Sequence, residues 1–225
     1  MAFEIVALIA IAVTCGLTLL VLFEPGLSYR VVPPGLALDS AAFIRLVAAV
    51  SDSEIRHADT FEVLTNGSHF YASELAAIAA ASASVHIEAF IFHPGDIGDR
   101  FIAALTERAR SGVKVRLVVD AIGSFPTPNR YFASLRAAGA VVAGYQPIRW
   151  YTLKRVNNRT HRELVIVDGQ VGYIGGAGIG AHWINDRSGA SPPWRNTLVR
   201  FPGRIVGALQ TPLWGSGGGS TGGDS

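Results

Sequence analysis

The sequence predicts an α/β domain that follows a single apolar helix at the N-terminus. Two observations carry this prediction. Residues 3–23 are almost purely apolar, and from residue 61 onward stretches with the two-residue period of strands alternate with stretches of helical period. Alternating strands and helices of these lengths are typical of a sheet that helices cover on both faces. We therefore expect an α/β/α sandwich around a mostly parallel mixed sheet.

The apolar segment at residues 3–23 is long enough to cross a membrane. As a helix its 21 residues rise about 31 Å, close to the thickness of a bilayer's hydrocarbon core. A cleaved signal peptide is the main alternative, but no Lys or Arg precedes the segment, and apolar sequence continues after Cys15, where a lipoprotein signal would end. Because Arg30 follows the segment, we expect an anchor in the inner membrane with the remaining chain on the cytoplasmic side.

The predicted domain is preceded by a linker with a short helix and followed by a Gly/Ser-rich tail. Residues 24–38 hold three prolines and two glycines, as a linker would, and Asp39 and Ser40 can cap a helix that ends near Ala49. The last eleven residues contain no side chain able to join a core. The expected organisation is a transmembrane anchor over 1–24, a linker with a short helix over 25–60, a folded domain over 61–212 and a flexible Gly/Ser-rich tail over 213–225.

Within the domain, periodicity predicts each element in turn. The clearest helix places Ile97, Phe101, Leu105 and Ala109 at steps of four, and the clearest hairpin has a tight turn at 168–170 between two apolar strands. Strands are expected over 61–65, 85–92, 113–119, 140–144, 163–167, 171–174 and 197–201, a turn at Asn66-Gly67, and helices over 71–78, 97–109, 131–138 and 205–209.

Charge is distributed unevenly, although the formal net charge is only +2. Between Asp120 and Glu163 the sequence has no acidic residue, and this stretch also contains Trp150 and Tyr151. The basic residues in it are Arg130, Arg136, Arg149, Lys154, Arg155, Arg159 and Arg162. Such a segment attracts phosphate oxygens, and beside a membrane anchor the natural partner is an anionic lipid rather than nucleic acid, which stays an alternative.

The most specific pattern lies at residues 157–180, NNRTHRELVIVDGQVGYIGGAGIG. In it His161 is followed seven residues later by Asp168, and six further residues lead to Gly175-Gly176. This spacing resembles the signature of the phospholipase D superfamily: His, any residue, Lys, four residues, Asp, six residues, then Gly-Gly/Ser-x-Asn. The flanking residues, together with VDAIGS at 119–124 and PWRNTLVRFPG at 193–203, resemble bacterial cardiolipin synthases. The resemblance covers residues 61–210 and corresponds to the N-terminal half of such an enzyme.

The resemblance implies a mechanism and a set of site residues. In that family two motifs meet across a cleft, one histidine attacks the lipid phosphorus, and the other protonates the leaving alcohol and then activates the acceptor, with neither metal nor cofactor. His161 would be the nucleophile or the acid–base residue, and Asp168 would fix its orientation. Glu163, at the third position of the motif, is counted with these two as part of the catalytic set. The expected phosphate-binding residues are Arg159, Arg162, Gly176 and Gly178.

Three positions depart from the family pattern. Glu163 occupies the lysine position, Gly178 the asparagine position, and Asn196 the aspartate position of the Trp-Arg-Asp segment. A carboxylate roughly 4 Å from a phosphate would be repelled by about 4 kcal/mol at an effective dielectric of 20, where lysine would be attracted. A second motif is not found within these 225 residues. We therefore expect an impaired site that needs a homodimer partner or a separate second half.

Weaker patterns give two further interpretations. The sequence from Gly176 to Ala181 matches G-x-G-x-x-A after a strand, as in dinucleotide-binding proteins, but no second βαβ unit with a ribose-binding acid follows. The histidines outside the motif show no metal-ligand spacing, and only His93, beside Pro94 and Gly95, is a candidate for lining a cleft.

Three functions remain open on the sequence. The leading one is a cardiolipin synthase-like phosphatidyltransferase that acts on membrane phospholipid. The second is a single-motif phosphodiesterase or nuclease of the same superfamily that completes its site as a homodimer. The third is a pseudoenzyme that only binds anionic lipid, which the glutamate at position 163 favours.

Overall fold

The computed structural model describes residues 2–22, 35–52, 54–148, 150, 156–184, 192–203 and 205–210. The chain divides into two compact units, residues 1–55 and residues 56–225. The predicted linker is described only in part, and the predicted Gly/Ser-rich tail lies outside the described residues.

The first unit contains two apolar helices. Helix α1 spans Ala2–Leu22, and its segment Ala2–Leu20 has a mean hydropathy of 2.4 with no part of it buried, so by length and composition it is able to cross a membrane. Helix α2 spans Ala41–Val50 and begins as predicted, because the Ser40 hydroxyl accepts a hydrogen bond from the Phe43 N–H at 3.1 Å.

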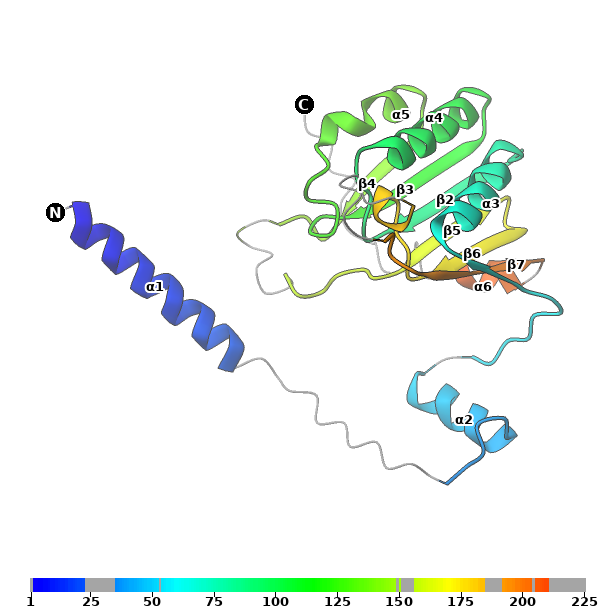
Figure 1. The fold of residues 1–225 in the computed structure, drawn as a ribbon, viewed down its shortest axis with the longest axis horizontal. Coiled ribbons are helices and arrows are strands. Elements are labelled where there is room, and N and C mark those ends of the chain that lie inside the picture. Colours follow the sequence, from blue (N-terminus) through cyan, green and yellow to red (C-terminus); the bar gives the residue numbers. More distant parts are fainter. Residues whose placement is uncertain are drawn as a thin grey trace. The chain divides into compact units, whose positions relative to one another are not determined.

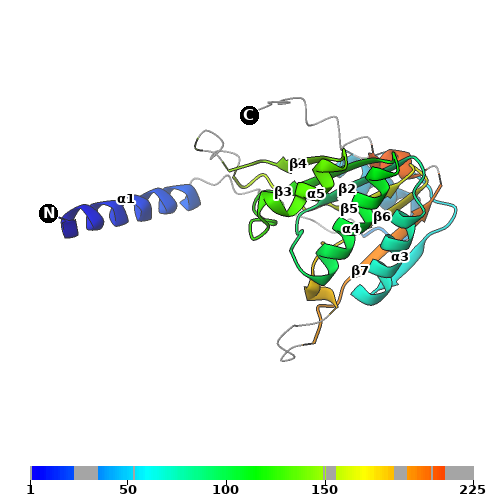
Figure 2. The ribbon, with the colours of Figure 1, turned by 90° about the horizontal axis from the view of Figure 1, so that it is seen from above.

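The second unit is built on one seven-stranded sheet, whose strands both views of the ribbon show (Figures 1 and 2). In order across the sheet the strands are β1 (Glu62–Thr65), β7 (Thr197–Pro202), β6 (Val171–Gly175), β5 (Glu163–Val167), β2 (Ser84–Ala89), β3 (Lys114–Asp120) and β4 (Val141–Tyr145). The predicted α/β fold with a mixed sheet is confirmed.

The expectation that the sheet is mostly parallel is wrong. Of the six strand pairs described, only β2–β3 and β3–β4 are parallel, and the other four are antiparallel. The parallel part is the part joined by helical crossovers, whereas the turn at 168–170 makes β5 and β6 a hairpin and β7 returns beside β6. Periodicity predicted the order of strands and helices correctly but not the direction of each pair.

Helices cover the two faces of the sheet unequally. Helices α3 (Gly67–Ala79), α4 (Asp96–Arg110) and α5 (Ala133–Ala137) lie together over one face, and α6 (Ile205–Gln210) packs on β6 and β7 from the other (Figure 1). Successive side chains of β5 point to opposite faces of the sheet and so belong to two separate hydrophobic clusters. Val165 and Val167 join the large cluster under α3 and α4, whereas Leu164 and Ile166 pack with Val206 of α6.

Some element boundaries differ from the predicted ones for local reasons. Strand β2 ends at Ala89, before the expected residue 92, because the Phe90 and Ile91 N–H groups donate to the Glu163 side chain. The expected turn at Asn66-Gly67 is shorter than predicted, because Asn66 is the N-cap of α3 and Gly67 is its first residue. The expected helix over 131–138 is a 3-10 turn, η1 (Asn129–Phe132), followed by the short α5.

The β5–β6 turn is fixed by the carboxylate of Asp168. Asp168 and Gly169 both adopt positive φ (52° and 64°), the conformation that a two-residue Asp-Gly turn requires. The carboxylate oxygens accept hydrogen bonds from the N–H groups of Ser82, Ala83 and Ser84 at 2.7–2.9 Å, and from the Ser82 hydroxyl at 2.9 Å. Asp168 therefore joins the hairpin to the loop between α3 and β2.

Replacing Asp168 with Ala should lower the stability of the domain. Partial burial acts to raise the pKa of Asp168, but the hydrogen bonds from Ser84, Ser82 and Ala83 hold it below the ordinary value. Because the folded-state pKa is depressed, this contribution is present above the unfolded-state pKa and is lost as pH falls through the folded-state pKa. We expect a loss of about 2 kcal/mol in the free energy of unfolding at neutral pH.

The measurement is denaturant unfolding of the full chain in detergent at neutral and acid pH. Asp168→Asn is the matched control, since asparagine tolerates the same positive φ but carries no charge. An Asp168→Ala variant as stable as wild type at neutral pH would contradict the assigned role.

Candidate active site

The motif histidine lies at the end of the sheet where β2 and β3 finish. Strand β5 runs antiparallel to β2, with Leu164 opposite Glu88, so the residues just before β5 lie beyond the last residue of β2. His161 is exposed there, and its ring lies against the Phe90 ring with centroids 4.2 Å apart. An exposed imidazole two residues before β5 is accessible to a substrate that approaches this edge.

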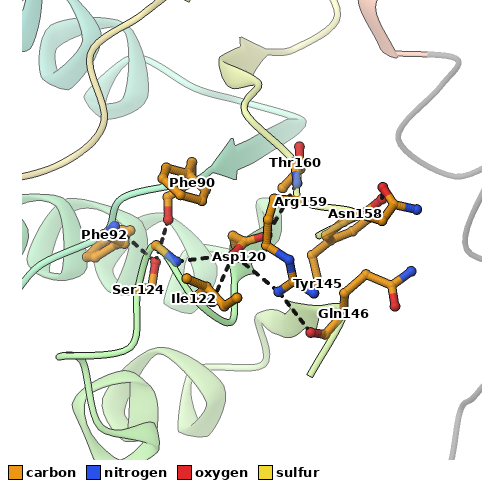
Figure 3. A network of polar contacts seen from close by, with 11 residues as sticks. Phe90, Phe92, Asp120, Ile122, Ser124, Tyr145, Gln146, Asn158, Arg159 and Thr160 are labelled. Atoms are coloured by element: carbon orange, nitrogen blue, oxygen red, sulfur yellow. Dashed lines mark hydrogen bonds and ion pairs between the residues drawn. The ribbon is translucent and has the colours of Figure 1, made fainter. Parts of the chain in front are cut away.

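A fully buried carboxylate, Asp120 at the end of β3, holds the segment that carries the histidine (Figure 3). One carboxylate oxygen accepts from the N–H groups of Ile122 at 2.8 Å and Gly123 at 3.1 Å, and the other accepts from the Thr160 N–H at 3.2 Å. Arg159 Nη1 lies 3.5 Å from the same carboxylate. Asp120 thus joins the loop after β3 to the residue directly before His161.

Ser124 fixes the segment after β2, on which the histidine ring rests. Its hydroxyl donates to the Phe90 carbonyl at 3.0 Å and accepts from the Phe92 N–H at 3.0 Å, as Figure 3 shows. The Thr127 hydroxyl donates to the Phe92 carbonyl. Sequence reasoning did not assign site roles to Asp120 or Ser124. The signal was present in the VDAIGS resemblance, which places both residues beside the motif.

The Glu163 side chain points into the protein. It is 8% exposed, and Oε1 accepts hydrogen bonds from the N–H groups of Phe90 and Ile91, both at 3.2 Å. Burial raises the pKa of Glu163 to about 8, although the bonds from Ile91 and Phe90 act to lower it, and Glu88 adds to the rise. At neutral pH Glu163 is therefore mostly uncharged, so the repulsion expected of a carboxylate beside phosphate is largely removed.

A second buried glutamate faces the same interior space. Glu74 of α3 and Glu163 both line a cavity of about 10 Å³, which is near the lower limit for one water molecule. Burial raises the pKa of Glu74 to about 8, and the neighbouring Glu163 contributes to that rise. Two carboxyls that both favour the protonated form can be buried together at neutral pH, where two carboxylates would repel.

The two arginines expected to bind phosphate, Arg159 and Arg162, both contact buried carboxylates in this structure. The buried Arg159 side chain donates to the Gln146 carbonyl at 3.0 Å and pairs with Asp120. Arg162 lies 3.2 Å from a carboxylate oxygen of Glu88 and donates to the Leu209 carbonyl at 3.0 Å, on the α6 side of the sheet. Both guanidinium groups are used to satisfy buried carboxylates and carbonyl groups, as charges removed from water must be.

In the glycine loop after β6, Gly178 is packed too tightly to be replaced by a larger residue. A Cβ on Gly178 would lie 2.6 Å from the Ile91 carbonyl oxygen and 2.9 Å from Glu163 Oε1. A Cβ on Gly176 would lie 3.2 Å from the Asn196 side chain. The Tyr71 hydroxyl lies 2.5 Å from the Gly178 carbonyl oxygen and so fixes the loop. Gly178 therefore adjoins Glu163, and an asparagine at position 178 has no room in this backbone.

Asp168 is not brought to His161. The two residues lie at opposite ends of β5, whose five residues separate them by roughly 20 Å at the rise of a strand. All four hydrogen bonds to the Asp168 carboxylate come from residues 82–84, at the far edge of the sheet. The expectation that Asp168 orients the histidine is wrong, and its role is to fix the hairpin.

Two histidines from distant parts of the chain meet beside the site. His93 Nδ1 and His182 Nε2 are 3.2 Å apart, and His93 Nε2 lies 3.1 Å from the Gly123 carbonyl oxygen. Because a carbonyl only accepts, His93 Nε2 carries the proton and His182 Nε2 donates to His93. The His182 ring stacks on Trp194 with centroids 5.1 Å apart, and burial together with His93 lowers its pKa. His93 is the histidine that the sequence indicated as a candidate for lining a cleft. The sequence did not indicate its partner, His182.

The rival dinucleotide interpretation lacks its structural context. The Gly176–Ala181 pattern follows β6, but it leads to a three-residue 3-10 turn, η3 (Ala181–Trp183), instead of a helix whose N-terminus would face a pyrophosphate. Among the described residues no group of three or more His, Cys, Asp or Glu side chains is arranged to hold a metal ion.

Comparison with known proteins finds relatives among the cardiolipin synthases. The family described as "Cardiolipin synthase, PLD-like domain" matches residues 75–185. The cardiolipin synthase of Geobacillus kaustophilus is 33% identical over 168 residues, which are 74% of this chain and 33% of the relative. Cardiolipin synthase A of Pseudomonas fluorescens is 36% identical over 149 residues, which are 66% of this chain and 31% of the relative. The chain thus spans about a third of the length of these relatives.

A solved structure supports the fold alone. The phosphatidylserine synthase of Haemophilus influenzae superimposes with a TM-score of 0.55 at 13% identity, covering 71% of this chain and 37% of that one. The likeness extends over most of the sheet-based unit, which therefore has a known fold.

Replacing Glu163 with Gln should reduce the fall in the free energy of unfolding that we expect as pH rises. Between the ordinary pKa of 4.5 and about 8, the folded chain keeps protons on Glu74 and Glu163 that the unfolded chain releases. Stability should therefore fall as pH rises through this window, by up to about 1.4 kcal/mol per pH unit for each carboxyl. Glu163→Gln keeps an oxygen for the Phe90 and Ile91 N–H groups and should flatten the fall.

Unfolding of wild type, Glu163→Gln and Glu74→Gln in denaturant at several pH values measures this effect. The difference between wild type and each variant isolates the carboxyls from the histidines, which also titrate. If all three proteins lose stability equally between pH 5 and 8, these carboxyls are not held in their protonated form.

Proposed function

Because the chain carries a phospholipase D-like domain of the cardiolipin synthase type, we propose that it forms one half of a phosphatidyltransferase site at a phospholipid membrane. The observation that carries the proposal is the position of His161. It is exposed beside the ends of β2 and β3, within the segment that matches the family, on a loop fixed by Asp120. The reaction is transfer of a phosphatidyl group to a glycerol-type acceptor.

The His161 ring supplies the nucleophile or the acid–base group. As the nucleophile, a ring nitrogen attacks the phosphorus, the bond from phosphorus to the leaving alcohol breaks, and the alcohol takes a proton from a second histidine. The acceptor hydroxyl then gives its proton to that second histidine and attacks the phosphohistidine, which returns the electron pair to His161. The second motif histidine comes from another subunit of this chain or from a separate half.

The replacement of the motif lysine weakens catalysis mainly because the attraction between lysine and the phosphate is lost. A lysine near 4 Å from phosphate contributes about 4 kcal/mol at an effective dielectric of 20. The raised pKa of Glu163 keeps its carboxyl mostly neutral, and the carboxyl is directed to the Phe90 and Ile91 N–H groups. Position 163 therefore lacks the motif cation but does not carry a strongly repelling anion, and we expect the activity of the site to be slow.

The apolar α1 serves as the anchor in this proposal. Its length suits a single pass through the inner membrane, with the sheet-based domain on the cytoplasmic side, where both the phospholipid donor and the acceptor lie in reach.

A binding role without turnover is the second candidate. It is favoured by one observation, that the buried Glu163 replaces the motif lysine, whose charge would assist turnover. In that case the domain holds anionic lipid without cleaving it.

The test is formation of labelled cardiolipin from labelled phosphatidylglycerol by the full chain in vesicles. We expect little product from the chain alone, and product that depends on His161 when a half-enzyme carrying an intact second motif is added. His161→Ala should remove all of that gain. Turnover of about 1 per second or faster by the chain alone would contradict the proposed impairment.

The same assay separates the alternatives. If no cardiolipin forms in any combination while the chain still binds the vesicles, the binding role replaces the transferase. If the chain cleaves a soluble phosphodiester or DNA but transfers no phosphatidyl group, the membrane substrate is wrong and the nuclease-like function replaces it.

A further inference from the structure

Four apolar side chains are exposed on two loops at the edge of the sheet where His161 lies. Phe125 (78% exposed) and Ile122 lie on the loop after β3, and Trp150 (84% exposed) and Ile148 lie on the loop after β4. We call these four side chains the edge patch. Large exposed apolar side chains on neighbouring loops mark an interaction site more often than scattered ones do.

The loop that presents Phe125 is well fixed, so its exposure is built into the fold. The Phe125 N–H donates to the Ile122 carbonyl at 3.0 Å, and the Thr127 N–H donates to the Ser124 carbonyl at 2.9 Å. Asp120 accepts from Ile122, and the buried Ser124 hydroxyl bonds to the segment after β2 (Figure 3). A loop held by this many bonds keeps the Phe125 ring in water instead of folding it onto the core.

The second loop leaves the sheet beside the first one. Asp120 and Tyr145 are opposite each other in the parallel β3–β4 pair, and the Ala121 N–H donates to the Tyr145 carbonyl at 3.1 Å. The segment before His161 adjoins both loops, since Thr160 donates to Asp120 and Arg159 donates to the Gln146 carbonyl. The edge patch and the motif histidine therefore belong to the same edge of the sheet.

The sequence of the two loops suits an anionic surface. Both loops lie in the stretch between Asp120 and Glu163, which contains no acidic residue. Arg130, just after the first loop, is exposed. Aromatic rings beside basic residues are the composition that favours the boundary between lipid headgroups and acyl chains.

We propose that the edge patch inserts into the surface of an anionic phospholipid bilayer and holds the candidate site against the headgroups. This inference rests on the proposed function, because it names how the same site reaches its lipid. With the apolar α1 as the proposed anchor, the chain is already at a bilayer and the surface need not bind from solution. A second copy of the chain is the weaker occupant, since a stable protein interface takes roughly 20–30 residues on each side.

The experiment places a fluorescent probe on the edge patch of the full chain. In a Cys15→Ser background, Phe125→Cys and Trp150→Cys are labelled with an environment-sensitive dye and reconstituted in phosphatidylglycerol vesicles, with plain or brominated acyl chains. The matched control is Val141→Cys, because Val141 is 53% exposed but lies at the opposite end of β4. Since all three positions are exposed, the labelled chains should fold as wild type does.

We expect the dyes at 125 and 150 to emit at shorter wavelength and to lose most of their emission to brominated lipid, whereas the dye at 141 changes little. Equal emission in plain and brominated vesicles at 125 and 150, or equal quenching at 141, would overturn the proposal. A wavelength shift that is already present in lipid-free detergent and grows with protein concentration would assign the edge patch to a contact between copies instead.

The outcome can be separated from that of the transfer assay. Quenching at 125, with no cardiolipin formed even when the second half-enzyme is added, would leave the bilayer contact standing and remove the transferase function. Cardiolipin formation without quenching would leave the function standing and remove the edge patch from it.

Discussion

The arrangement at the candidate site depends on the burial of one carboxylate, that of Asp120. A buried charge is tolerated only when hydrogen bonds and an opposite charge replace the water it has lost. Here the partners are three backbone N–H groups and the Arg159 guanidinium. They come from two segments, the loop after β3 and the residues before β5, so satisfying one carboxylate brings the two segments together.

The hydrogen bonds of Asp120 position both groups on which the proposed activity depends. The residues before β5 carry His161, which is placed against Phe90 beyond the end of β2. The loop after β3 carries Ser124, which fixes the segment of Phe90, and Phe125, which faces solvent. The group proposed to attack phosphorus and the surface proposed to meet the bilayer are thus held in place together.

The glutamate at the motif's lysine position shows how a departure from a family pattern can be absorbed by the fold. Glu163 does not extend toward the substrate edge but ends the β2 ladder early by accepting from Phe90 and Ile91. The adjoining Gly178 leaves room for its carboxyl, and Glu74 lines the same cavity. The motif alone suggests Glu163→Lys with Gly178→Asn as a repair. In this backbone the second change would place a Cβ 2.6 Å from the Ile91 carbonyl oxygen.

Sequence reasoning predicted the elements well because their signals are local. The four-residue steps through Phe101 and the Asp-Gly turn at 168 indicate a helix and a hairpin without knowledge of the rest of the chain. Periodicity does not contain sheet topology, which sets the strand directions and the distance from Asp168 to His161. It also does not contain contacts between residues more than 80 positions apart, such as those of Asp168 with Ser82 and of His93 with His182. The motif spacing indicated His161, whose catalytic role stays a prediction, and it gave Asp168 a role in orienting that histidine, which the length of β5 between them excludes. Arg159 and Arg162, expected at the phosphate, contact Asp120 and Glu88 in this structure.

The most direct test of this account is hydrogen exchange on the full chain with the substitution Asp120→Asn. Asparagine has nearly the same shape but cannot supply a charged acceptor to three N–H groups and Arg159. We expect faster exchange in both 121–125 and 158–162, and unchanged protection in residues 82–84, which Asp168 holds. If exchange increases in only one of the two segments, or increases equally throughout the sheet, the Asp120 carboxylate is not what joins them.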